Sequence, residues 1–257
     1  MFKRHLPVVA AAVGCLVLSA CSGVPGSATD GHGPVGTPTP ATPSGARTPP
    51  APSSSVPLPT RGAAGAIPDT ARLRQLVLQP GEADGVQGPG AGVHDMHPSE
   101  LDGDAGAEVG PAPCRTMWAL LNQRGAQAAV TQTFGSVPPG NPQVTFLASH
   151  AGTGATTAFG QLRAALAACP PHASDGRKAT VRYEDLDAAG FPEDTLRIRI
   201  TVQDEGSDQP ADVFDRIVAR VGVCIVDMVG MGPEPQPRLA EQPVLRQIQR
   251  VRAAQGL

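Results

Sequence analysis

Aromatic residues are scarce in this chain of 257 residues, which has six Phe and only one Trp and one Tyr. Proteins that bind sugars or single-stranded nucleic acid stack them on aromatic rings, so the chain has little material for either task. Positive charge is also in short supply, because 23 Asp and Glu outnumber 20 Lys and Arg and the formal net charge is −3. We therefore expect no nucleic-acid partner.

The apolar run near the start, residues 6–18, is too short to span a bilayer, which takes about 20 residues. Lys3 and Arg4 precede the run and small residues follow it, so the pattern predicts a secretory signal peptide over residues 1–20. The next residues, Leu-Ser-Ala-Cys at 18–21, match the bacterial lipobox, in which the thiol of Cys21 receives a diacylglycerol. The alternative is a plain signal peptide with a chance cysteine at the junction. We expect a lipid anchor on Cys21 and a protein on the extracytoplasmic face of the cell membrane.

A tether is predicted to follow the anchor, so that residues 21–67 form a lipidated cysteine and a disordered linker. This segment is dominated by Pro, Gly, Ser, Thr and Ala, contains no aromatic residue and has no apolar periodicity. Such a composition cannot bury enough apolar surface to offset the entropy of ordering the chain.

Residues 68–257 are predicted to form one folded domain of the α+β class, with a single mostly antiparallel sheet packed against amphipathic helices. The helical patterns cover residues 70–78, 155–169 and 243–254, and the last of these places Arg250 on its polar side. The strand patterns cover residues 126–134, 143–149, 180–184, 196–203, 213–219 and 223–229. Residues 75–114 contain no Lys or Arg between their ends and predict a long acidic loop. Two-residue and three-residue turns around Val221-Gly222 both remain open for the last hairpin.

Three cysteines remain in the mature domain, Cys114, Cys169 and Cys224, and the residues alone leave all three pairings open. Cys224 lies among apolar residues of a strand, which favours a buried thiol over a nucleophile.

Imidazole and carboxylate groups gather in the acidic loop at His94, Asp95, His97, Asp102 and Asp104. These are ligand types for zinc, but the spacing does not fit a calcium loop, and we favour a solvated loop without a metal or other cofactor.

Three arginines are the candidate ligand-binding residues. Arg197 and Arg199 alternate with apolar residues along one predicted strand, so they share its polar face, and Arg182 can join them from another strand. Such a stripe either is simply solvated or holds an anionic ligand.

The arrangement of these features resembles the PknH-type extracellular sensor domain, which occurs on receptor serine/threonine kinases and in secreted lipoproteins. The features are Leu-Val-Leu-Gln-Pro-Gly at 76–81, a cysteine after an acidic loop, a helix that ends in Cys169, the strand at Arg220-Val221-Gly222 and a terminal helix. The resemblance implies a compact α+β fold with a polar cleft, and a disulfide between Cys114 and Cys169. The family often has two disulfides, and three cysteines allow only one here.

Together these features predict a surface lipoprotein whose domain binds or senses a ligand or partner at the cell envelope without catalysis. The alternative is an extracytoplasmic carrier of a lipid or another small apolar ligand, which would need an apolar cavity. A third possibility is an enzyme acting on wall polymers, but no catalytic motif in the sequence supports it.

Overall fold

The computed structural model describes residues 66–86, 92–102, 110–135, 142–174, 176–187, 190–235 and 238–257. The predicted signal peptide, the predicted lipidation site Cys21 and nearly all of the predicted tether lie outside these residues, as does Asp104.

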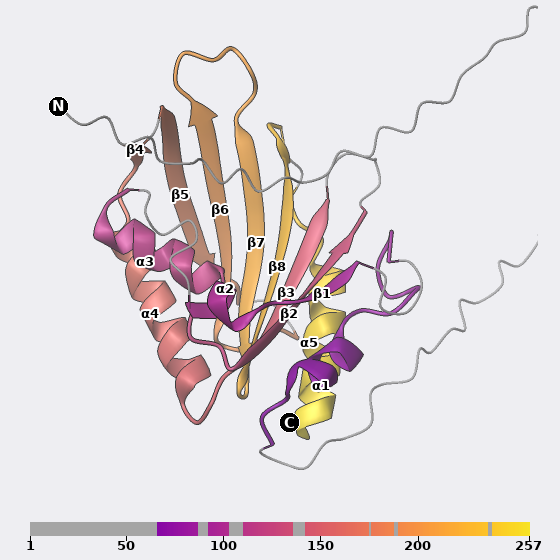
Figure 1. Cartoon of the computed structure of the whole chain (residues 1–257). Coiled ribbons are helices and arrows are strands. Elements are labelled where there is room, and N and C mark those ends of the chain that lie inside the picture. The colour runs from indigo at the N-terminus through magenta and orange to yellow at the C-terminus, as the bar shows by residue number, and fades with distance from the viewer. Residues whose placement is uncertain are drawn as a thin grey trace, which may run out of the picture. The chain divides into compact units, whose positions relative to one another are not determined.

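One antiparallel sheet of eight strands organises the described part of the chain (Figure 1). The strand order is β1-β2-β3-β8-β7-β6-β5-β4. The strands are β1 (Val93–Asp95), β2 (Ala128–Phe134), β3 (Gln143–Ser149), β4 (His172–Ser174), β5 (Arg177–Asp185), β6 (Thr195–Asp204), β7 (Asp212–Val221) and β8 (Cys224–Pro233). Every neighbouring pair runs antiparallel, which confirms the predicted α+β class with a single antiparallel sheet.

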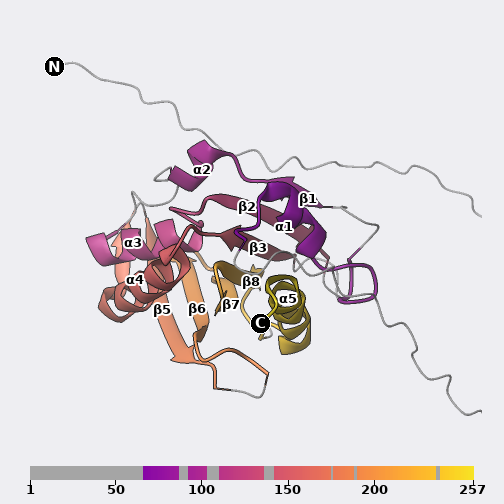
Figure 2. The same cartoon turned by 90° about the horizontal axis from the view of Figure 1, so that it is seen from below.

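Among the residues that the structure describes, five helices cover parts of both faces of the sheet, as the view from below shows (Figure 2). They are α1 (Thr70–Leu76), α2 (Pro98–Asp102), α3 (Ala112–Leu121), α4 (Gly154–Ala168) and α5 (Glu241–Gln255). Within the described ranges, no helix is long and apolar enough to cross a membrane. We call the side that carries α1 and α5 the α5 face, and the side that carries α3 and α4 the α4 face.

The core on the α5 face forms where α5 lies on β7 and β8. Val244, Ile248 and Val251 recur at helical spacing and are fully buried against strand residues such as Ile217 and Met228. The polar side of α5 differs from the prediction, because Arg250 is buried. Its guanidinium donates to Oε1 of Glu82 at 3.1 Å and to the carbonyl oxygens of Gln75 and Leu76, the last two residues of α1. The ion pair and these hydrogen bonds hold residues 75–82 against α5. The first part of the predicted acidic loop is therefore folded.

The core on the α4 face is built from α3, α4 and the opposite sides of β6 to β8. Phe159, Leu162 and Leu166 of α4 face strand residues such as Leu196 and Ile198. Helix α3 was not predicted, and neither were α2, β1 and β4. The acidic loop therefore holds two short elements, and within it Asp95 accepts two hydrogen bonds from Arg74, at 2.5 and 2.8 Å.

The β7–β8 hairpin has a two-residue turn, one residue later than the predicted turn at Val221-Gly222. Val221 pairs with Cys224, so the turn residues are Gly222 and Val223. Gly222 has φ of 59° at the first turn position, where a type II′ turn takes glycine, and Val223 avoids positive φ. The shift leaves Ala219, Cys224 and Val226 on the α5 face, as predicted.

Candidate functional site

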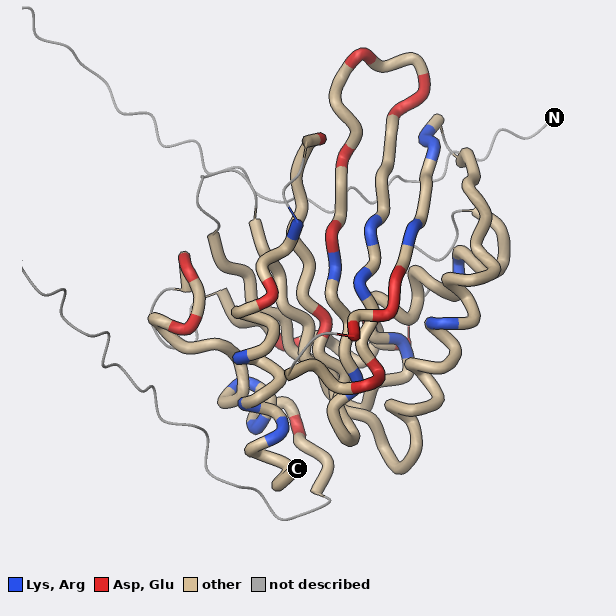
Figure 3. The backbone as a smooth tube through the Cα atoms, turned by 180° about the vertical axis from the view of Figure 1, so that it is seen from behind, with Lys and Arg blue, Asp and Glu red and all other residues tan. Residues whose placement is uncertain are grey.

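The candidate site is a polar pocket on the α5 face, at the part of β5 and β6 that no helix of the described chain covers (Figure 1). Arg182 of β5 lies directly opposite Arg199 of β6, and Thr180 lies opposite Thr201. These four residues and Glu234, at the end of β8, line a cavity of about 240 Å³. Seen from behind, Lys and Arg follow the two neighbouring strands on this side (Figure 3).

The local sequence explains why these groups converge. In antiparallel strands, residues that face one another point to the same side of the sheet, so the polar residues at alternate positions of β5 and β6 form one polar surface. Two guanidinium groups and two hydroxyl groups supply hydrogen-bond donors suited to phosphate or carboxylate oxygens. The carboxylate of Glu234 adds an acceptor at the rim. The pocket can therefore hold a small anion that also carries a hydrogen-bond donor.

Arg197 does not belong to this pocket, although it shares the face with Arg199. Its side chain is only 4% exposed. It donates to the carbonyl oxygen of Leu239 at 3.0 Å and lies 3.5 Å from carboxylate oxygens of Asp215 and Glu241. The prediction that Arg197 belongs to a stripe of three arginines is therefore wrong, because the residues just before α5, near Leu239, cover this part of β6.

A second buried ion pair, between Arg216 and Asp227, lies on the α4 face. The two-residue turn predicted at Val221-Gly222 would place these residues directly opposite each other, whereas in the structure Arg216 lies opposite Val229 and Asp227 opposite Val218. Arg216 binds Asp227 through two nitrogens, with Nε to Oδ1 at 3.2 Å, and also donates to the carbonyl oxygen of Leu121. Its guanidinium lies 5.5 Å from the centre of the Phe146 ring. Because Arg216 and Asp227 are both less than 5% exposed, this pair belongs to the core and not to a ligand site.

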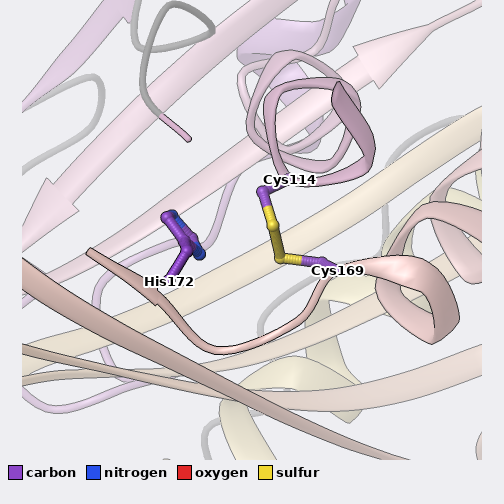
Figure 4. Close-up of side chains that lie close together, drawn as sticks. All are labelled: Cys114, Cys169 and His172. Carbon is purple, nitrogen blue, oxygen red and sulfur yellow. A yellow bond between two sulfur atoms is a disulfide. The ribbon is translucent and has the colours of Figure 1, made fainter. Parts of the chain in front are cut away.

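The disulfide between Cys114 and Cys169 is present, as the family resemblance implied (Figure 4). It joins the first turn of α3 to the end of α4, with the two Cα atoms 4.8 Å apart. His172 lies beside the bridge, and its Nδ1 is 3.1 Å from the carbonyl oxygen of Pro170. Since the sulfurs are bonded to each other, neither is a thiolate, and this group offers no metal site.

Cys224 is the remaining cysteine of the domain, and it is buried and unbridged as predicted. Burial raises the pKa of its thiol to about 12. At neutral pH the thiolate is therefore essentially unpopulated, which excludes Cys224 as a nucleophile in the folded domain.

Comparisons with known proteins find similar solved structures. No family model matches the chain, and no curated protein is similar to it in sequence. The crystal structure of the extracellular domain of PknH from Mycobacterium tuberculosis is similar at 11% identity and a TM-score of 0.44, over 75% of this chain and 99% of that chain. This is the family that the sequence resembles, and the assignment of the chain to it stays a prediction.

Proposed function

We propose that this protein is a cell-surface lipoprotein, anchored through Cys21, whose extracytoplasmic domain binds an anionic ligand of the envelope in the Arg182–Arg199 pocket without catalysis. One contrast among the described residues carries the proposal: the pocket is open and polar, whereas the cavity between α3, α4 and the sheet is very small. The interior cavity between α3, α4 and the sheet measures about 10 Å³, which is room for one water molecule. That contrast favours a binding module over a carrier of apolar ligands, which needs a cavity of several hundred Å³.

The chemistry of the pocket defines the ligand class. Arg182 is exposed and, among the described residues, forms no ion pair, so its guanidinium is available to a ligand. Arg199 faces the same cavity from the next strand. A ligand that engages both needs two acceptor oxygens on one anionic group, as in a phosphate or carboxylate.

Inorganic pyrophosphate is the probe that tests the pocket. In titration calorimetry with the detergent-solubilised full chain, Arg182→Gln is expected to weaken binding at least about tenfold, because a charge-assisted hydrogen bond contributes about 1.5–3 kcal/mol. Lys178→Gln is the matched control, since Lys178 is an exposed cation of β5 outside the pocket lining. An equal loss of affinity in both variants would mean that pyrophosphate is attracted only by the general positive charge of the strand.

The anchor is tested separately. Cys21→Ala is expected to release the protein from the membrane fraction, because the variant lacks the thiol that takes the lipid. Cys15→Ala is the control, since that residue lies within the predicted signal peptide and is removed with it. Fractionation and blotting decide the matter. A Cys21→Ala variant that stays as firmly membrane-bound as the parent would contradict the lipobox interpretation.

A further inference from the structure

In the part of the chain that the structure describes, most of the outer edge of β5 has no partner strand. Strand β4 pairs with β5 only at Arg177 to Ala179. Beyond that point, no strand among the described residues pairs with the outer side of Thr180 to Asp185. The four consecutive residues 182–185 are all exposed, although their side chains alternate between the two faces. Tyr183 is 40% exposed and is one of two exposed large hydrophobic residues in the described chain.

The hydrogen bonds at the two ends of β5 show which backbone groups face outward. The carbonyl oxygen of Gly176 accepts from N–H of Glu205 at 2.7 Å, and N–H of Leu186 donates to the carbonyl oxygen of Thr195 at 3.0 Å. Both are even-numbered residues in the register that joins β5 to β6. In an antiparallel pair, residues alternate between bonding to the neighbour and pointing away from it. The N–H and C=O groups of Val181, Tyr183 and Asp185 therefore point away from β6 and are available to another strand.

We propose that this edge binds the same edge of a second copy of the chain, antiparallel, about a two-fold axis at Tyr183. Tyr183 lies at the centre of the unpaired stretch from Thr180 to Leu186. A two-fold axis at Tyr183 therefore lets the two copies pair along this whole stretch, up to the residues of β5 that pair with β4. The outward backbone groups of Tyr183 then bond to those of Tyr183 in the partner, and the two rings lie side by side. A homodimer of this kind is isologous and closes on itself, leaving no free edge at β5.

Charge favours an axis at Tyr183 over an axis at either adjacent residue, Arg182 or Glu184. About Tyr183, Arg182 of each copy faces Glu184 of the other on the α5 face, which gives two complementary pairs across the interface. An axis at Arg182 would place two arginines opposite each other, and an axis at Glu184 would do the same with two glutamates. Like charges directly opposite destabilise a strand pair. Within the chain, Glu184 contacts Arg238 at 2.9 Å with both side chains at least half exposed, so this contact is readily exchanged.

Disulfide trapping tests the axis in the membrane-bound full chain. Residues opposite each other in a hydrogen-bonded antiparallel pair have Cα atoms about 5.5 Å apart, within the range that a disulfide spans. Tyr183→Cys is expected to run as a species of twice the mass on a non-reducing gel and to revert with reductant. Ser207→Cys, in the exposed β6–β7 loop, is the control and is expected to remain a monomer. A Tyr183→Cys chain that crosslinks no more than this control would overturn the proposal.

Charge reversal in the Tyr183→Cys background tests the register. Glu184→Arg places arginines opposite Arg182 of the partner and is expected to cut the crosslinked fraction at least about fivefold. Adding Arg182→Glu restores complementary pairs and is expected to restore crosslinking. Failure of the double exchange to restore it, in chains whose Cys114–Cys169 bridge maps normally, would overturn the Tyr183 register. Crosslinking is measured without pyrophosphate, so these outcomes do not depend on the proposed ligand. Because Arg182 also lines the pocket, the Arg182→Glu chains are not used to test ligand binding.

Discussion

Removal of the Cys114–Cys169 bridge is expected to lower the free energy of unfolding by about 4 kcal/mol. The two residues are 55 positions apart, and a crosslink that closes a loop of this length restricts the unfolded chain by about that amount. For a domain of this size, the loss corresponds to a fall of about 8–16 °C in Tm. The double variant Cys114→Ser/Cys169→Ser is the one to measure, because a single change would leave a thiol able to pair with Cys224.

The control for the bridge is Cys224→Ala, which removes a buried sulfur but no crosslink. It is expected to cost about 1–2 kcal/mol through lost packing. Denaturant unfolding of the oxidised full chain compares the two. If the double variant unfolds within about 1 kcal/mol of the parent, the bridge does not stabilise the domain as we argue.

Arg216→Met is expected to destabilise the domain by about 3–5 kcal/mol, because it leaves the carboxylate of Asp227 buried without its charge partner. Burial raises the pKa of Asp227, and the guanidinium of Arg216 opposes that rise. Without the guanidinium, the folded-state pKa rises further above its unfolded value. A group of this kind stabilises the fold at low pH and loses that contribution as the pH rises through its folded-state pKa. The defect should therefore be smaller at pH 5 than at pH 8.

The double variant Arg216→Met/Asp227→Leu provides the control for the buried pair. Replacing both ions with apolar side chains removes the unpaired charge, so we expect it to recover part of the lost stability. Chemical denaturation at the two pH values measures all three proteins. An Arg216→Met chain that is equally stable at both values, or no less stable than the parent, would contradict the proposed role of the pair.

The sheet was predictable from sequence because apolar residues at alternate positions specify which side of a strand is buried. Leu196, Ile198 and Ile200 show this in β6, where all three are fully buried. The same pattern could not reveal the burial of Arg197, because the residues that cover its side chain lie near Leu239, more than forty positions away in the sequence. The partner of Arg250, Glu82, is likewise distant in the sequence.

Helix α3 shows a signal that was present but not used. Cys114, Met117 and Leu121 recur at helical spacing, and all three are fully buried. Gly and Pro residues just before Cys114 extended the apparent loop over the start of the helix. In the pocket, the sequence pattern grouped Arg182 with Arg199, and the register of β5 and β6 places the two opposite each other. Glu234 was missed, because its place at the rim depends on where β8 ends.

Native mass spectrometry of the full chain, extracted from its membrane in mild detergent, tests the central claim most directly. If the domain is a binding module with a filled core, the protein should carry the covalent lipid on Cys21 and no noncovalent apolar ligand. Added pyrophosphate should then appear as one bound equivalent per chain in the parent and be lost in Arg182→Gln. A stoichiometric lipid that stays bound to the Cys21→Ala chain, together with no pyrophosphate adduct, would contradict the account and identify the protein as a carrier.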